Sequence, residues 1–128
     1  MKRVALLALI ALSAATWSAA PAGAESKVVD SYCSPTGDFC QGIYREDGRL
    51  RARLTTFSFT GKIQLCLRGT DSSSSRDCKK FVLRDNEDLF LSSVALAKHF
   101  DISAPGRYAV SWRYRGTRIG ETLHFNKG

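Results

Sequence analysis

The stretch KIQLCLRGTDSSSSRDCKKFVLR, residues 62–84, has the clearest pattern of secondary structure in the chain. On both sides of its serine-rich loop, apolar residues alternate with polar ones, the pattern of two half-buried strands whose successive side chains point to opposite faces. Antiparallel pairing that puts Ile63 opposite Phe81 also brings Cys66 and Cys78 together on the mainly polar face. The stretch therefore predicts a hairpin stapled by a disulfide, with an apolar underside that faces a core.

The beginning of the chain has the pattern of an export signal. Two basic residues precede an apolar run over residues 4–12, and residues 22–24 (AGA) form a small-residue cleavage pattern. The run is too short for a membrane-spanning helix, which needs about 20 residues. We expect residues 1–24 to be a signal peptide, residues 25–128 to form a single domain, and the protein to be secreted. Removing two basic residues lowers the formal net charge from +7 to +5.

All four cysteines lie in the predicted mature part. An even number in a small exported domain indicates two disulfides. Three connectivities are possible, and the short local loops favour Cys33–Cys40 together with Cys66–Cys78. The six-residue spacer between Cys33 and Cys40 differs from the CxxC of an oxidoreductase. The chain also has no CxxC pair, and neither of its two histidines has ligand spacing, so we expect no metal site.

The remaining segments read as further short strands. Asp47-Gly48 predicts a tight type I′ hairpin turn that places Ile43 opposite Ala52. Further along the chain, residues 89–100 are expected to form a strand, or a strand that runs into one short helical turn near residues 93–99. The last third predicts a hairpin that turns at residues 115–116 and directs Trp112 into the core.

The spacing of these strands resembles that of a known fold. Seven or so short strands, ending in PGRYAVSW at residues 105–112, resemble an immunoglobulin-like β-sandwich. In that resemblance Tyr108 is the tyrosine that hydrogen-bonds back to the corner before the penultimate strand, although no cysteine follows in this strand. The chain also resembles small secreted bacterial proteins with a C-x6-C loop and a stapled hairpin, which have no assigned activity. The resemblance implies an all-β, immunoglobulin-like sandwich of about seven antiparallel strands.

The candidate binding residues are two arginine clusters, one on a predicted strand and one on the final hairpin: Arg49, Arg51, Arg53, Arg113, Arg115 and Arg118. On the final hairpin, Arg113 and Arg118 are expected to lie opposite each other. Like charges directly across a strand pair are destabilising, so a bound anion would explain their presence. The alternative is a solvated outer face whose charges also protect strand edges against aggregation.

Catalysis is not indicated by the sequence. A hydrolytic triad needs a histidine placed between a carboxylate and a nucleophile, and no GxSxG motif occurs. We expect a monomeric, non-catalytic binding module without a cofactor, whose partner is an anionic cell-envelope component or an exported protein. We expect it neither to bind nucleic acid nor to have a stable membrane anchor. The alternative is an inhibitor of an exported hydrolase, of protease or lysozyme type, with a pre-ordered loop, either Cys33–Cys40 or Gly69–Asp77, as the inserting element. The excess of arginine speaks against a third possibility, an enzyme acting on polysaccharide.

Overall fold

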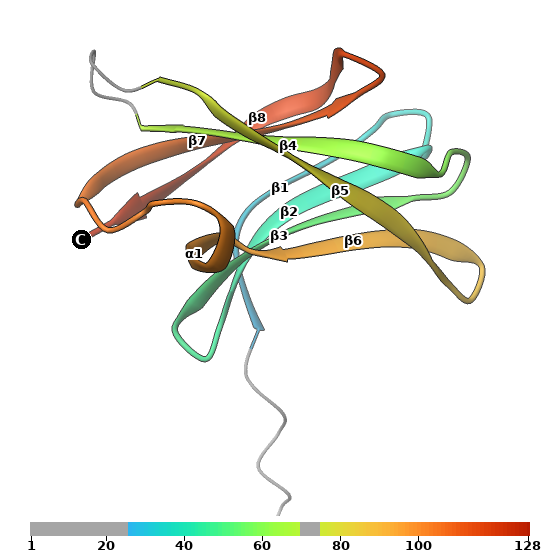
Figure 1. The fold of residues 1–128 in the computed structure, drawn as a ribbon. Helices are drawn as coiled ribbons and strands as arrows, with labels where there is room; N and C mark the ends of the chain where they lie inside the picture. Colours follow the sequence, from blue (N-terminus) through green and yellow to red (C-terminus); the bar gives the residue numbers. More distant parts are fainter. Residues whose placement is uncertain (1–25, 70–74) are drawn as a thin grey trace, which may run out of the picture.

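The protein folds as one antiparallel sheet that curves into a nearly closed barrel (Figure 1). The computed structural model describes residues 26–69 and 75–128, so the predicted signal peptide and the tip of the loop after residue 69 lie outside the described part. The elements in chain order are β1 (Ser26–Cys33), β2 (Phe39–Glu46), β3 (Arg49–Thr56), β4 (Gly61–Gly69), β5 (Asp77–Asn86), β6 (Leu89–Ala95), α1 (Leu96–His99), β7 (Gly106–Tyr114) and β8 (Thr117–Lys127).

The all-β prediction is confirmed, but an immunoglobulin-like sandwich of about seven strands is not. The described chain has eight strands in the order β1-β2-β3-β6-β5-β4-β7-β8. The long strand β5 connects the two halves of the sheet: residues 77–83 pair with β4 and residues 84–86 pair with β6. Because the same strand belongs to both halves, they form one curved sheet instead of two separate packed layers.

The edge strands β1 and β8 are joined by side chains. The backbone N–H of His124 on β8 donates to Oδ2 of Asp30 on β1 at 2.9 Å. Nearby, the buried amide of Gln41 donates through Nε2 to the backbone carbonyl of Glu121. Gly120 has a φ of +66°, and a Cβ there would lie 2.7 Å from Oε1 of Gln41. A glycine at this position therefore lets β8 approach Gln41 where the barrel closes.

The stapled hairpin has the predicted register. Ile63 lies opposite Phe81, and Cys66 forms a disulfide with Cys78. The second disulfide joins Cys33 to Cys40, so the favoured connectivity is confirmed. The short helical turn is α1, which follows β6 within the predicted range.

Two predicted local features are also present. Asp47 and Gly48 both have positive φ, +50° and +73°, as the tight hairpin turn requires. The hydroxyl of Tyr108 donates to the carbonyl of Ala104 at 2.6 Å, the corner contact that the resemblance implied. This tyrosine contact is compatible with a barrel, because it depends only on the sharp entry of the chain into β7.

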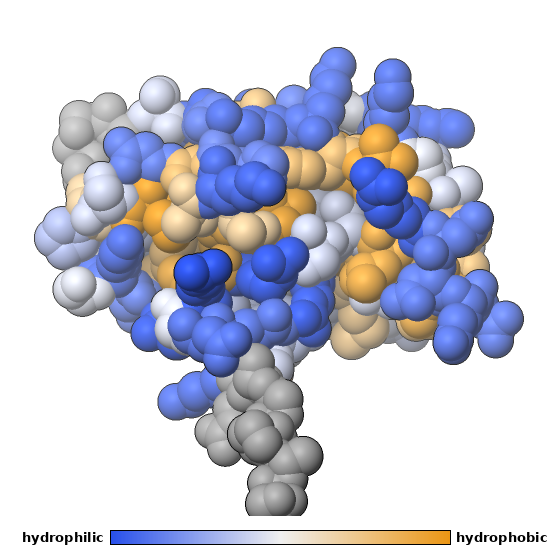
Figure 2. Space-filling model, turned by 60° about the horizontal axis from the view of Figure 1, so that its bottom comes forward, coloured by the Kyte–Doolittle hydropathy of each residue, from blue (hydrophilic) through white to orange (hydrophobic). Residues whose placement is uncertain are grey.

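The core lies inside the barrel and receives side chains from all parts of the sheet. Trp112 is fully buried at its centre, together with Ile43, Leu54, Leu65 and Val110. Figure 2 shows the side of the molecule that carries β6 and α1, where apolar surface lies in separate areas divided by hydrophilic side chains. No helix among the described residues is long and apolar enough to span a membrane.

Candidate functional site

The first predicted arginine cluster lies on β3 and is neutralised by its neighbours. Glu46, at the end of β2, forms an ion pair with Arg53 and lies 4.0 Å from Nε of Arg51. The guanidinium of Arg53 also lies over the ring of Tyr44, 4.8 Å from its centroid, and Nε of Arg51 donates to Oγ of Ser93 at 3.1 Å. These interactions already occupy both arginines.

Arg49 belongs to the same surroundings. In the pairing of β2 with β3, Arg49 lies directly opposite Glu46. Arg49 and Arg51 line a hollow of about 360 Å³ together with Glu46 and Asp47. Two acidic and two basic side chains share this hollow, so the surface over β3 has little excess charge with which to attract an anion.

The second predicted cluster lies on the other side of the barrel and is much more basic. Counting around the sheet, β6, β5 and β4 separate β3 from β7 in one direction, and β2, β1 and β8 separate them in the other. The two arginine clusters therefore do not form one patch. On the second side, Arg113 lies directly opposite Arg118 as predicted, and Gln64 and Lys80 continue the same row across β4 and β5.

Seven cationic side chains gather on the outer surface of β4, β5, β7 and β8 and of the segments that join them, which we call the basic face: Lys62, Arg68, Arg76, Lys80, Arg113, Arg115 and Arg118. The ion pairs formed between described residues all use Glu46, which is remote from this face. The guanidinium of Arg113 donates to the carbonyl of Gly116 at 2.6 Å, and that of Arg118 to the hydroxyl of Thr122 at 3.4 Å. Both contacts orient the guanidinium groups without neutralising them.

Two hollows lie side by side on the basic face. The first hollow, of about 280 Å³, is lined by Lys62, Gln64, Lys80, Arg113 and Arg115 among others. The second hollow, of about 350 Å³, is lined by Arg68, Arg76, Arg113, Arg118 and the hydroxyls of Ser111 and Thr122 among others. No acidic side chain of the described residues lines either hollow. Both hollows are thus strongly positive, and they share Arg113.

Arg115, the third predicted residue of this cluster, lies in the β7–β8 turn at the edge of the first hollow. It has a φ of +50°, and its guanidinium lies 5.2 Å from the centroid of the Tyr114 ring. The sequence prediction missed Lys62, Arg68, Arg76 and Lys80. Alternation along the stapled hairpin already placed Lys62, Arg68 and Lys80 on one face. Their proximity to Arg113 and Arg118 was missed because it depends on the pairing of β4 with β7, two segments far apart in the chain.

The disulfide between Cys66 and Cys78 lies in the middle of the basic face. Cys66 lines the second hollow and is almost completely buried. The disulfide joins β4 to β5, and β4 in turn pairs with β7. The cationic side chains therefore project from a cross-linked part of the sheet, which limits how far the strands that carry them can separate.

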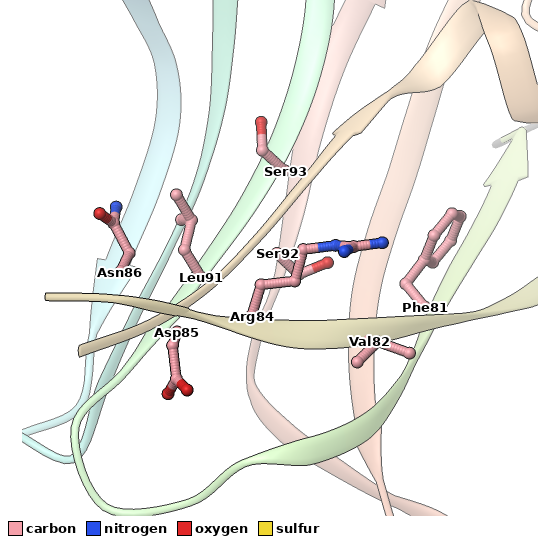
Figure 3. A pocket seen from close by; sticks show the side chains of 8 residues that line it. All are labelled: Phe81, Val82, Arg84, Asp85, Asn86, Leu91, Ser92 and Ser93. Carbon is pink, nitrogen blue, oxygen red and sulfur yellow. The ribbon is translucent and has the colours of Figure 1, made fainter.

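A third hollow, of about 400 Å³, lies where β5 and β6 diverge (Figure 3). Arg84 extends along the gap toward Phe81, while Asp85 points away from it. The lining combines one cation and one acid with serine, asparagine and apolar side chains. This mixture selects for no particular ligand chemistry, in contrast to the two positive hollows.

One acidic side chain is tuned by its surroundings. Hydrogen bonds from the hydroxyl and the backbone N–H of Ser103, at 2.6 and 3.1 Å, lower the pKa of Asp101, and the charge of Lys127 lowers it further. Asp101 lies in the exposed connector between α1 and β7. Its hydrogen bonds order this connector.

Metal ligation and relatives give no further guidance. Among residues 26–69 and 75–128, no three histidine, cysteine, aspartate or glutamate side chains come together in a way that could hold a metal ion. Comparisons with protein-family models, curated proteins and solved structures found no match to this chain.

Proposed function

We propose that the protein is a secreted, non-catalytic binding module that recognises an anionic component of the cell envelope through the basic face. The observation that carries this proposal is the pair of Arg113 and Arg118, which lie directly opposite each other with no carboxylate of the described residues beside them. Like charges across a strand pair destabilise a sheet. A bound anion offsets this repulsion, whereas without a ligand the two arginines only lower the stability of the sheet.

Compartment and oligomeric state belong to the same proposal. Two disulfides in a small domain are typical of oxidising compartments, which supports secretion. The predicted signal peptide has the same implication. A monomer suffices for this function, because both hollows of the basic face are formed by one chain.

The test uses two matched double variants. Arg113→Gln/Arg118→Gln removes two charges from the basic face, and Arg51→Gln/Arg53→Gln removes two from β3. We expect the wild-type protein to be retained on a sulfated or phosphorylated polymer at low salt and released at high salt, because exposed charge contacts are screened. The basic-face variant should elute at clearly lower salt, and the β3 variant like the wild type. Equal elution of all three proteins would contradict the proposal.

A second candidate function rests on the Cys33–Cys40 loop. Besides the disulfide, the hydroxyl of Thr36 donates to Asp38 at 2.8 Å and lies 2.7 Å from the hydroxyl of Ser34. The backbone N–H of Phe57, whose side chain is 51% exposed, donates to the carbonyl of Asp38. A pre-ordered loop beside an exposed aromatic ring suits an inhibitor of an exported hydrolase, since little entropy is lost on binding. The other loop considered for this role, between β4 and β5, lies largely outside the described residues.

Enzyme assays test this second candidate. The purified protein should inhibit at least one member of a panel of proteases, lysozymes and amidases at micromolar concentration. Phe57→Ala should weaken that inhibition, and Val82→Ala, which removes an equally exposed apolar side chain elsewhere, should not. Absence of inhibition across the panel would eliminate the inhibitor function and leave the basic face unaffected.

A further inference from the structure

We infer that the ligand of the basic face is a linear polymer with repeated phosphate or sulfate groups, which lies along β4 and occupies both hollows at once. This inference rests on the proposed function and gives it a ligand class. It is carried by the arrangement of the two hollows, which are separate, uniformly positive and joined through a shared arginine.

The two hollows follow each other along β4. The first hollow is lined by Lys62, Ile63 and Gln64, and the second by Cys66, Leu67 and Arg68. This offset of four residues corresponds to roughly 13 Å along a strand that rises about 3.3 Å per residue. A single small anion therefore reaches one hollow only. A polymer with anionic groups along its length can place one group in each.

Arg113 is placed to link the two binding positions. It lines both hollows and is only partly exposed, and its contact with the carbonyl of Gly116 fixes the position of the guanidinium. A guanidinium has five N–H donors in a planar fork, so one such group can contact two anionic groups at the same time. This geometry favours a ligand that continues from the first hollow into the second.

The donors of the second hollow favour phosphate or sulfate over carboxylate. Four arginines and two hydroxyl side chains line it: Arg68, Arg76, Arg113, Arg118, Ser111 and Thr122. Planar guanidinium groups bind phosphate-type oxygens through paired hydrogen bonds, and each phosphate or sulfate offers more acceptor oxygens than a carboxylate. A polymer of phosphate or sulfate groups can therefore satisfy more of the donors in this hollow.

A lipid surface fits the basic face less well. Proteins that bind membranes at the interface combine basic residues with apolar side chains that enter the acyl region. Among the described residues, the exposed large apolar side chains are Val28, Val29, Phe57 and Val82. Only Val82, opposite Lys62, lies beside the basic face. One valine contributes little apolar area, so the charge of this face is better suited to a polymer in solution or in a cell wall.

The experiment compares anions of increasing length by calorimetric titration. The probes are orthophosphate, inorganic triphosphate, long-chain polyphosphate and a sulfated polysaccharide, with vesicles containing an anionic phospholipid as the lipid arm. We expect both polymers to bind far more tightly than orthophosphate or triphosphate, because only a long chain reaches both hollows. For the seven cations of the basic face, log affinity should fall against log salt with a slope of about −5.

Two matched variants then separate one hollow from the other. Lys62→Gln/Lys80→Gln changes the first hollow alone, and Arg68→Gln/Arg76→Gln changes the second alone. A polymer that spans both hollows should lose about tenfold or more in affinity with either variant, because binding in one hollow no longer holds the polymer close to a second binding position. If the hollows bind separate ligands, blocking one reduces the apparent affinity by at most about twofold. The variant Arg113→Gln should be the most damaging single substitution on this face.

The outcomes separate this inference from the proposed function. Triphosphate binding as tight as polymer binding, or twofold effects of the hollow variants, would overturn the spanning polymer while leaving anion binding by the basic face intact. Stronger capture by anionic vesicles than by either polymer would replace the polymer with a lipid surface. Absence of binding to every anion at low salt would overturn the proposed function itself.

Discussion

The outer surfaces of β3 and of the β4–β7–β8 region both carry rows of arginine, and their neighbours give these rows opposite properties. On β3, Glu46 from the adjacent strand pairs with Arg53 and approaches Arg51. On the basic face, Arg113 has Arg118 on one side and uncharged Gln64 on the other. A row of arginines along a strand therefore does not define a binding site. The residues on the adjacent strands determine whether it is neutralised or remains available.

The largest expected effect comes from the disulfide beneath the basic face. Cys66→Ser/Cys78→Ser opens a link with a sequence separation of 12 and should lower the free energy of unfolding by about 3 kcal/mol. Because this link joins two strands of the basic face, polymer affinity should also fall while the protein remains folded by circular dichroism.

The matched control is Cys33→Ser/Cys40→Ser, which opens a link with a sequence separation of 7 at the end of the barrel. It should lower stability by a similar amount, about 2.5 kcal/mol, with unchanged polymer affinity. Equal losses of affinity in both variants would show that general loosening, and not the rigidity of the basic face, controls binding.

Gln64→Glu converts the basic face into a surface like that over β3. Gln64 lies opposite both Lys80 and Arg113, so the new carboxylate meets a cation on each neighbouring strand. We expect polymer affinity to fall about tenfold, since two of the cations gain an internal partner and the added negative charge repels the polymer. The free energy of unfolding should rise, by about 0.5 kcal/mol, as opposite-charge pairs form across the strands.

Gln64→Met is the control for this change, because it alters the side chain without adding charge. It should leave polymer affinity within about twofold of the wild type, because uncharged surface substitutions have small effects. A comparable loss of affinity with Met would mean that the amide of Gln64 itself contacts the ligand. The affinity of Gln64→Glu would then no longer measure neutralisation alone.

The sequence was sufficient for the local pairing and insufficient for the overall closure. Hairpin registers, both disulfides and the turn at Asp47 follow from alternation and turn chemistry, which act between residues close in the chain. The barrel depends on β5 pairing with both β4 and β6, and on Asp30 and Gln41 reaching β8. Such contacts bring together distant segments, and no local pattern specifies them.

The candidate site shows the same division. Arg113 and Arg118 were predicted because they face each other within one hairpin. Arg68 and Arg76 complete the second hollow, but their proximity to Arg118 depends on β4 pairing with β7. A cation close to Glu46 could have been anticipated, since Glu46 and Arg49 flank the same tight turn. That Glu46 reaches Arg53 across the strand pair is a matter of side-chain geometry that the sequence does not contain.

Glu46→Gln performs the reverse change on β3. The variant leaves Arg51 and Arg53 without their carboxylate partner, so the free energy of unfolding should fall by about 0.5 to 1 kcal/mol, as for a partly exposed ion pair. The surface over β3 should then bind polyanions weakly at low salt. Urea denaturation and polymer titration of the same preparation measure both effects. If stability is unchanged, the ion pairs with Glu46 contribute nothing, and exposure to solvent alone keeps β3 from binding.

Arg118→Gln tests whether the basic face is maintained for binding or for stability. The substitution removes one of two like charges that lie directly opposite each other, and should raise the free energy of unfolding by a few tenths of a kcal/mol, about 0.3. The same variant should bind the polymer less tightly and reduce the magnitude of the salt slope by about 1.

Opposite signs for stability and affinity are expected only if the arginine is kept for a ligand. A loss of stability in Arg118→Gln, measured by urea denaturation without polymer, would instead show that its contact with Thr122 at 3.4 Å outweighs the repulsion from Arg113. The basic face would then owe its arginines to the fold.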